Sequence, residues 1–338
     1  MIRTICFGLL MNFTTPPLIS SLEKPASVNE CTVRAAFDLG SGTFKLSVAE
    51  VIGNDIQLKF SKTIKVGLGL DLAESQSRSF SEKIQTIASS ALAELIQDAK
   101  EKGATQFAGI ATAAFRHALN GNVFLDKLVN ETKIPIRLIS QKEEGILAFK
   151  TFLNVFPEIN EKKCIALDLG AASFQLTKKN NQFHDVIQEP LGVSGVLKMF
   201  SENIKNISYQ RGFLFTPITL NEIKLLIEEI ENKIFSDCVI QTWFLNKPFE
   251  VLYLDDWIDE IEQRTGQKEK ISKVQIWDAL IKTIDSININ PNLKEQSYIM
   301  TYALLYSIMD KSKINDLRVK LHTSGNTLGM MTEDCFWP

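Results

Sequence analysis

The sequence is poor in the residues that build disulfide and metal scaffolds. Its 338 residues include only five cysteines and three histidines. The cysteines lie far apart, form no Cys-x-x-Cys pair and are odd in number. This argues against a disulfide framework or a zinc ribbon and favours a reducing compartment. No His-Glu-x-x-His or His-x-x-x-His spacing occurs, so a metal site built from histidines is not expected.

Neither charge nor hydropathy points to a nucleic acid or a membrane as partner. The chain carries 37 Lys and Arg against 40 Asp and Glu, a net charge of -3, and lacks the basic footprint of a protein that coats nucleic acid. No apolar run approaches the roughly 20 residues of a membrane-spanning helix. With 45% apolar residues the chain can still bury real cores. At about 150 residues per domain, its length predicts two domains.

Residues 1–32 are expected to form a flexible N-terminal tail. Arg3 and the apolar residues after it have the charge-then-apolar order of a short signal peptide. Gly8 and Asn12 interrupt that apolar run, and no clear small-x-small cleavage site follows. The interpretation that we favour is therefore a cytoplasmic protein with a loose tail, and export by a weak signal is the alternative.

An internal repeat is the most informative feature. The segment DLGSGTFKL at 38–46 recurs as DLGAASFQL at 168–176. Each copy follows a short apolar run and precedes alternating residues, a pattern that predicts strand, tight turn and strand. One DLG alone is common by chance, whereas two copies that open similar hairpins indicate a duplicated domain.

Between and after the two copies, helical and strand patterns alternate, which is typical of an α/β fold. Asn120 is expected to cap a helix, and a capping box begins another at Thr219. Helices are predicted at 81–102, 120–130, 142–152, 220–234, 272–285 and 293–310, and further strands at 107–111, 134–139, 249–254 and 317–321. We assign residues 33–160 to a first domain and 161–338, with the terminal helices, to a second. Folding of those helices back onto the first domain is left open.

The repeated turns have the chemistry of a phosphate site. A turn that contains Gly40, Ser41, Gly42 and Thr43 exposes backbone N–H groups and hydroxyls, which suit phosphate oxygens. An Asp at the end of the preceding strand can hold a divalent cation, directly or through water. For one copy, an ordinary glycine hairpin with a capping Asp explains the pattern better. Two copies that face each other across a cleft favour the phosphate site.

At these motifs the chain resembles the exopolyphosphatase/guanosine pentaphosphate phosphohydrolase (Ppx/GppA) phosphatase family of the actin/sugar-kinase/Hsp70 superfamily. The resemblance covers roughly residues 33–331 and is strongest in IATAAFRHALNG at 110–121. It also rests on AFDLGSGTFKL (36–46), VGLGLDLAE (66–74), ISQKEEGILAF (139–149), ALDLGAASFQLT (166–177) and LGVSG (191–195). It implies two duplicated RNase-H-like α/β domains, the actin-like ATPase fold, with an interdomain cleft.

The resemblance also implies roles for individual residues. Glu143 and Glu144 match an acidic pair in which one glutamate is the general base that activates water, and Glu144 aligns best with that role. Phosphate would be bound by Arg116 and by the turn residues Gly40, Ser41, Gly42, Thr43, Gly170 and Ser173. Asp38, Asp168 and the position of Gln175 would support Mg²⁺ or Mn²⁺. Without the resemblance, Arg116 is explained as a surface residue, and the acidic pair as a favourable charge at a helix N-terminus.

The function that the resemblance implies is a phosphoanhydride hydrolase. It would release the terminal phosphate of inorganic polyphosphate, or of a guanosine penta- or tetraphosphate type of nucleotide, by metal-assisted attack of water. These would be its partners, and a homodimer is compatible with the resemblance.

Departures from the family pattern keep two alternatives open. The second turn has Ala171 and Ala172 where the family has glycines, and Gln175 stands in place of a glutamate. An Asp255-Asp256 pair occupies the place of a glycine-rich turn, where two carboxylates would repel phosphate. The first alternative is therefore a catalytically impaired relative that binds a phosphorylated ligand or a partner protein. The second, a kinase of the same superfamily, lacks the glycine turn that would hold adenosine.

Overall fold

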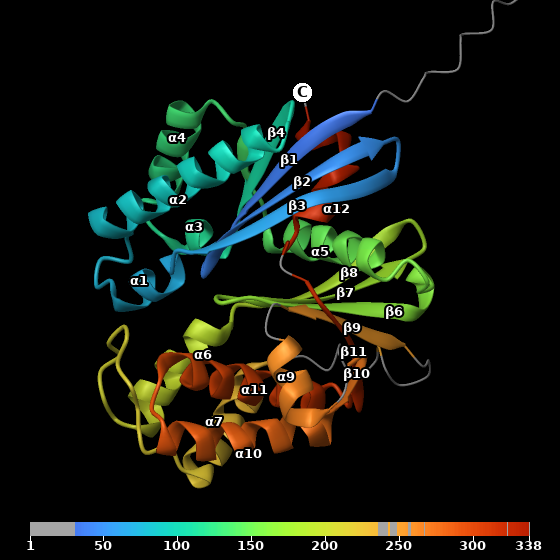
Figure 1. The fold of residues 1–338 in the computed structure, drawn as a ribbon. Coiled ribbons are helices and arrows are strands. Elements are labelled where there is room, and N and C mark those ends of the chain that lie inside the picture. Colours follow the sequence, from blue (N-terminus) through green and yellow to red (C-terminus); the bar gives the residue numbers. More distant parts are fainter. Residues whose placement is uncertain are drawn as a thin grey trace, which may run out of the picture.

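The described part of the chain forms two mixed sheets, each covered by helices (Figure 1). The computed structural model describes residues 31–235, 243, 249–255, 258–266, 268–322 and 324–337. The first sheet has five strands in the order β3-β2-β1-β4-β5, and the second has six in the order β10-β11-β9-β6-β7-β8. The α/β fold with two related halves is therefore confirmed.

The first sheet is antiparallel on one side of β1 and parallel on the other. Its strands are β1 (Thr32–Leu39), β2 (Thr43–Ile52), β3 (Asp55–Lys65), β4 (Gln106–Ala111) and β5 (Ile136–Leu138). The helices of this part are α1 (Leu68–Glu74), α2 (Glu82–Glu101), α3 (Ala113–His117), α4 (Gly121–Thr132) and α5 (Gln141–Val155). Helices α2 and α4 lie on one face of the sheet and α5 on the other (Figure 1).

Alternation along β1 decides where its aspartate points. Phe37 and Leu39 belong to the core under α2 and α4, whereas Ala36 packs in the opposite layer with α5 and the C-terminal residues. Because successive side chains of a strand point to opposite faces, Asp38 lies on the same face as Ala36. The sequence alternation therefore turns Asp38 toward α5 and the second half of the molecule.

The second sheet repeats this plan. Its strands are β6 (Cys164–Leu169), β7 (Phe174–Asn180), β8 (Phe183–Glu189), β9 (Glu250–Asp255), β10 (Lys270–Ser272) and β11 (Asp316–Leu321). Its helices are α6 (Val193–Met199), α7 (Leu220–Lys233), α9 (Ile258–Thr265), α10 (Lys273–Ile289) and α11 (Leu293–Lys311), with a π-helical turn η2 (Phe200–Ile204) after α6 and a 3-10 turn η1 (Glu161–Lys163) before β6. The two hairpins share a register, since Asp38 pairs with Lys45 and Asp168 with Gln175.

Local capping signals account for several helix starts. Thr219 and Glu222 form the predicted capping box of α7, and Ser140 and Glu143 form one at α5. The cap expected from Asn120 is wrong. Its side chain makes no cap bond at α4 and instead exchanges two hydrogen bonds with the backbone of Phe80, at 2.8 and 3.0 Å. A contact 40 residues away outcompetes the local cap.

The C-terminal residues return to the first sheet. After β11, α12 (Thr327–Met331) and η3 (Asp334–Phe336) pack with α5, β1 and β2. Two hydrogen bonds fasten α12, one from the Gly329 N–H to Thr151 Oγ1 at 2.8 Å and one between the hydroxyls of Thr327 and Ser47 at 2.6 Å. Among the helices of the described ranges, none is long and apolar enough to cross a membrane.

Candidate active site

Both repeated turns line one cavity of about 960 Å³ between the two halves. The lining includes Gly40, Ser41, Gly42 and Thr43 from the first turn and Gly170, Ala171, Ala172 and Ser173 from the second. The turns nearly touch, because a Cβ at Gly42 would lie 3.3 Å from Ala171 Cβ. The prediction that the two turns face one cleft agrees with this arrangement.

Each turn is tied by its carbonyl oxygens to the start of a short helix. Gly42 O accepts from the N–H groups of Val66 and Gly67 at 3.0 and 2.9 Å, and Ser41 O accepts from Gly69 N at 2.8 Å, just before and within α1. Ala171 O likewise accepts from Ser194 N at 2.8 Å at the start of α6. Within the described backbone, the N–H groups of Ser41 and Gly42 donate to no carbonyl, so they remain available to an anion.

Three carboxyl groups line the cavity beside the turns: those of Asp38, Asp168 and Glu144. Asp38 is buried, and its Oδ2 accepts a hydrogen bond from Asn326 N at 3.0 Å. Burial raises the pKa of Asp38, and nearby Lys45 opposes that rise. Burial also raises the pKa of Asp168 to about 6, with Lys45 lowering it and Asp38 raising it. The cavity therefore concentrates acidic groups that favour protons or cations.

Glu144 is held in the first turn of α5 against Arg116. Arg116 donates from Nη2 to Glu144 Oε2 at 2.8 Å and from Nη1 to the carbonyl of Ile139 at 2.9 Å. Even so, burial raises the pKa of Glu144 to about 8, because desolvation outweighs the attraction of Arg116. Arg116, predicted to bind phosphate, is absent from the lining of this cavity among the described residues and contacts Glu144 instead.

The raised pKa of Glu144 predicts how stability depends on pH. The folded protein keeps this proton up to about pH 8, whereas the unfolded chain releases it near its ordinary pKa of 4.5. The folded state therefore binds more protons in this window, and the stability from this group is lost as pH rises through about 8. Thermal unfolding of the ligand-free protein should show a lower midpoint at pH 8.5 than at pH 6. Glu144→Gln should reduce that difference, and an unchanged difference would contradict the assignment.

Glu143, the other member of the acidic pair, lies apart from the cavity. Its carboxylate accepts from Ser140 in the capping box and pairs with Arg137 at 3.2 Å. The bonds from Ser140 lower its pKa. Of the two glutamates, only Glu144 is among the residues that line the cavity.

Gln175 lies behind the lining. It is 1% exposed, pairs across the hairpin with Asp168 and donates from Nε2 to Ser173 Oγ at 3.3 Å. Ser173 lines the cavity and Gln175 does not. The side chains of the Asp255-Asp256 pair lie outside the described residues.

Sequence reasoning missed the cations of the cavity. Lys45, Lys65, Arg211 and Lys294 all line it. Lys45 could have been found, because the residue opposite Asp38 in a hairpin shares its face of the sheet. Arg211 follows no local pattern and reaches the cavity only through the fold.

The donor set fits a magnesium ion only in part. Within the part of the chain that the structure describes, no group of three or more His, Cys, Asp and Glu side chains is placed to hold a metal. Mg²⁺ commonly binds through one or two carboxylates together with water and substrate phosphates. Asp38 and Asp168 fit that mode, and Gln175 supplies no charge.

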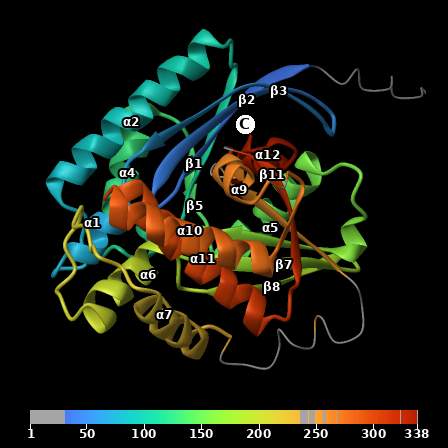
Figure 2. The ribbon, with the colours of Figure 1, turned by 60° about the horizontal axis from the view of Figure 1, so that its bottom comes forward.

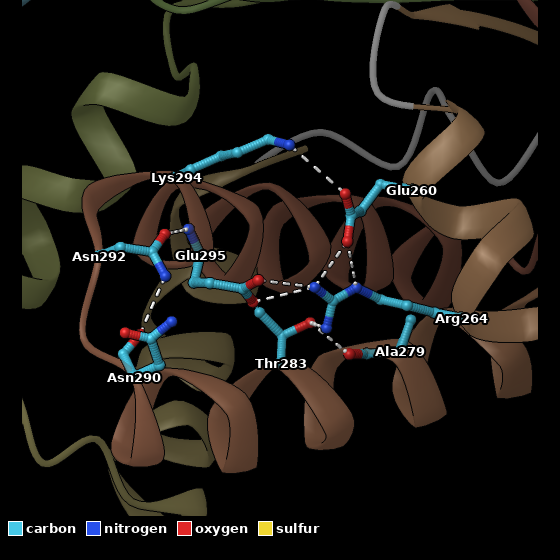
Figure 3. A network of polar contacts seen from close by, with 8 residues as sticks. All are labelled: Glu260, Arg264, Ala279, Thr283, Asn290, Asn292, Lys294 and Glu295. Atoms are coloured by element: carbon cyan, nitrogen blue, oxygen red, sulfur yellow. Dashed lines mark hydrogen bonds and ion pairs between the residues drawn. The ribbon is translucent and has the colours of Figure 1, made fainter.

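A partly buried polar network fixes the helix that forms the far wall of the cavity. Figure 3 shows Arg264 of α9 bonded to Glu260, to Thr283 of α10 and to Glu295 of α11 at 2.7, 2.9 and 2.8 Å. Asn292 caps α11 by accepting from Glu295 N at 2.9 Å. The network therefore holds the first turns of α11, which present Lys294, Ser297, Tyr298 and Thr301 to the cavity.

Comparison with known proteins gives a family for this arrangement. Residues 47–214 match the Ppx/GppA phosphatase family. Two solved structures share the fold over nearly their whole length. The Ppx-GppA enzyme of Aquifex aeolicus is 16% identical, with a TM-score of 0.66 and coverage of 90% of this chain and 99% of that one. An exopolyphosphatase from Cytophaga hutchinsonii is 14% identical, with a TM-score of 0.69 and coverage of 89% and 98%.

A curated relative is similar over a shorter stretch. The bifunctional 3-dehydroquinate synthase/phosphatase of Fusobacterium nucleatum is 26% identical over 186 residues, which cover 54% of this chain. The match spans only 26% of that relative's own length. The structural neighbours establish two actin-like domains as the fold. The family match includes the second DLG turn and begins just after the first.

Proposed function

With residues 47–214 in the Ppx/GppA phosphatase family, we propose that this protein is a phosphoanhydride hydrolase that releases the terminal phosphate of polyphosphate or of a guanosine pentaphosphate type of nucleotide. One observation carries the proposal. Two phosphate-type turns and the buried Glu144 line the same cavity. A phosphate chain that contacts both turns would bring its terminal phosphorus near a carboxylate able to accept a proton.

The chain's own residues provide the steps of this reaction. The free N–H groups of the first turn and the Lys45 ammonium would bind phosphate oxygens. Glu144 would take a proton from the water that attacks the terminal phosphorus, while the bond to the bridging oxygen breaks. Arg116 holds the Glu144 carboxylate through Nη2 and the Ile139 carbonyl through Nη1, so it would position the base. A divalent cation on Asp38 and Asp168 would neutralise charge on the bridging and leaving oxygens.

Phosphate release is the direct test. Purified protein is incubated with polyphosphate or with guanosine pentaphosphate, with and without Mg²⁺ or Mn²⁺, and orthophosphate is measured. We expect release that requires the metal. No release from either substrate at high enzyme concentration would contradict the proposal.

The second candidate is a catalytically impaired relative that binds a phosphorylated ligand. The observations that favour it are the uncharged, fully buried Gln175 beside Asp168 and the Ala171 methyl group close to Gly42. A thermal shift with ligand but no turnover would support it, since a ligand at 100 times its dissociation constant stabilises by about 2.7 kcal/mol. Turnover at ordinary enzyme rates would exclude it.

Gln175→Glu should raise activity at limiting Mg²⁺. The new carboxylate would lie next to Asp168 and behind the cavity lining, where it adds negative charge that favours a cation. Without metal the same group is buried among acids, so thermal stability should fall. Gln188→Glu is the matched control, because Gln188 pairs with Gln175 across β7 and β8 but is exposed. Equal effects of the two variants on metal dependence would contradict the prediction.

A further inference from the structure

A loop of the second half reaches the first half and contributes Tyr209, Arg211 and Gly212 to the cavity lining. It joins η2 to α7, and both ribbon views show this yellow segment beside α1 (Figures 1 and 2). The backbone N–H of Arg211 donates to the Glu74 carboxylate at the end of α1. Lys198 of α6 donates to Ala73 O at 3.2 Å. The loop is therefore anchored to the first half by its main chain, which leaves the Arg211 side chain free for another role.

The Arg211 guanidinium lies against the segment that supports the first phosphate turn. It lines the cavity together with Lys65 and Gly67, and its Nη2 donates a hydrogen bond to Val66 O at 3.4 Å. Gly67 makes this approach possible, because a Cβ there would lie 2.6 Å from Nη2 and its φ of +82 favours glycine. The N–H of Gly67 in turn holds the carbonyl of Gly42. The peptide group between Val66 and Gly67 therefore connects the two: its oxygen accepts from Arg211, and its N–H donates to the phosphate turn.

The guanidinium has unused hydrogen-bonding capacity. Among the described residues, no carboxylate forms an ion pair with it, in contrast to Arg116 with Glu144 and Lys294 with Glu260. The hydroxyl of Tyr209, two residues away and also in the cavity lining, is buried and finds no hydrogen-bond partner in the part of the chain that the structure describes. Burial raises the pKa of Tyr209 to about 12, so this hydroxyl keeps its proton. A guanidinium with only one hydrogen bond to its side chain among the described residues and a hydroxyl without a partner there therefore both belong to the cavity lining.

We infer that Arg211 is a phosphate-binding residue that the second half contributes to the site, and that it contacts a phosphate beyond the terminal one. The inference rests on the proposed function in one respect: the ligand is assumed to be a phosphoanhydride chain. Arg116 is bonded to Glu144, the residue proposed to activate the attacking water. Arg211 is bonded to the segment that supports the first turn and lines the cavity, as does Lys65. A planar guanidinium suits the spaced oxygens of a second phosphate group.

Binding of two inorganic ligands tests the inference without turnover. Calorimetry compares orthophosphate with tripolyphosphate for the wild type, Arg211→Ala, Arg211→Lys and the control Arg78→Ala. Arg78 is an exposed arginine shortly after α1 that does not line the cavity. We expect Arg211→Ala to weaken tripolyphosphate binding by about 10- to 100-fold and orthophosphate binding by less than about 2-fold, since one charge-assisted contact is lost only for the longer ligand. Arg211→Lys should recover part of the loss, and Arg78→Ala should match the wild type.

An equal loss for both ligands, or no loss for tripolyphosphate, would overturn the inference. If thermal unfolding shows that Arg211→Ala has lost its fold, Arg211→Gln carries the same comparison with a side chain of similar length. The inference and the proposed function fail separately. A wild type that binds tripolyphosphate through Arg211 but releases no orthophosphate from any phosphoanhydride contradicts the function and leaves the binding role intact.

Discussion

Glu144→Gln is expected to lower the rate of phosphate release by roughly 10²–10⁴-fold, the usual contribution of a positioned general base. Glutamine keeps the shape of the side chain and can accept a hydrogen bond from Arg116, but it cannot take the proton of the attacking water. Binding of tripolyphosphate should stay nearly unchanged. The measurement is the steady-state rate at saturating substrate and metal.

Glu143→Gln is the matched control on the same helical turn. Its carboxylate belongs to the capping box and to the ion pair with Arg137, so its loss should cost some stability but leave the rate close to that of the wild type. The pH profile adds a second readout. A base whose pKa is raised to about 8 in the free protein must be ionised to act, so kcat/KM should rise with pH toward about 8 and then level off. Full activity in Glu144→Gln, or loss of activity in Glu143→Gln instead, would contradict the assignment.

Gly192→Ala is expected to disrupt the second phosphate turn. A Cβ at this position would lie 2.4 Å from the carbonyl carbon of Ala171 and 2.5 Å from Ala172 N, both backbone atoms that cannot rotate away. The backbone of Gly192 is extended, so the penalty is steric rather than conformational. We expect destabilisation at the upper end of roughly 1–3 kcal/mol or beyond, together with loss of the bond from Ser194 N to Ala171 O.

Gly195→Ala, three residues further along and inside α6, separates this effect from a general cost of adding a methyl group. Its Cβ would meet only Leu191 Cδ1, at 2.9 Å, the end of a flexible side chain. Urea unfolding should show a much lower midpoint for Gly192→Ala than for Gly195→Ala, and tripolyphosphate binding should be lost in the first variant alone. Similar midpoints would show that the turn tolerates displacement from α6.

The parts of the fold that the sequence predicts are those with local causes. The two hairpins follow from alternation and turn glycines, and the start of α7 follows from its capping box, because each signal lies within a few residues. Asn120 fails as a cap for the opposite reason. Its side chain finds better partners in the backbone of Phe80, a segment that only the tertiary fold brings near.

The residues of the candidate site likewise fall into those that a local pattern predicts and those that only the tertiary fold brings together. Asp38, Asp168 and the turn residues lie at strand ends that the repeat identifies, and all of them line the cavity. Arg211 reaches the cavity from a distant segment without a motif of its own, so no local pattern could identify it. Lys45 was missed although it could have been predicted, because the register of the first hairpin places it opposite Asp38.

The return of the chain to the first sheet has a mechanical consequence. The two halves are joined by two covalent crossings, one between α5 and β6 and the other between β11 and α12. A single crossing would let the halves rotate about any axis through it. Two crossings define one hinge axis, and rotation about that axis is the easy relative motion of the halves. The second crossing runs beside the cavity, where Asn326 binds Asp38, while Figure 1 shows the Arg211 loop and α1 on the side away from both crossings. A small rotation would therefore hardly move Asp38 and would act mainly on the outer contacts between the halves, so the bonds from Arg211 N to Glu74 and from Lys198 to Ala73 O must break before the cavity can widen there.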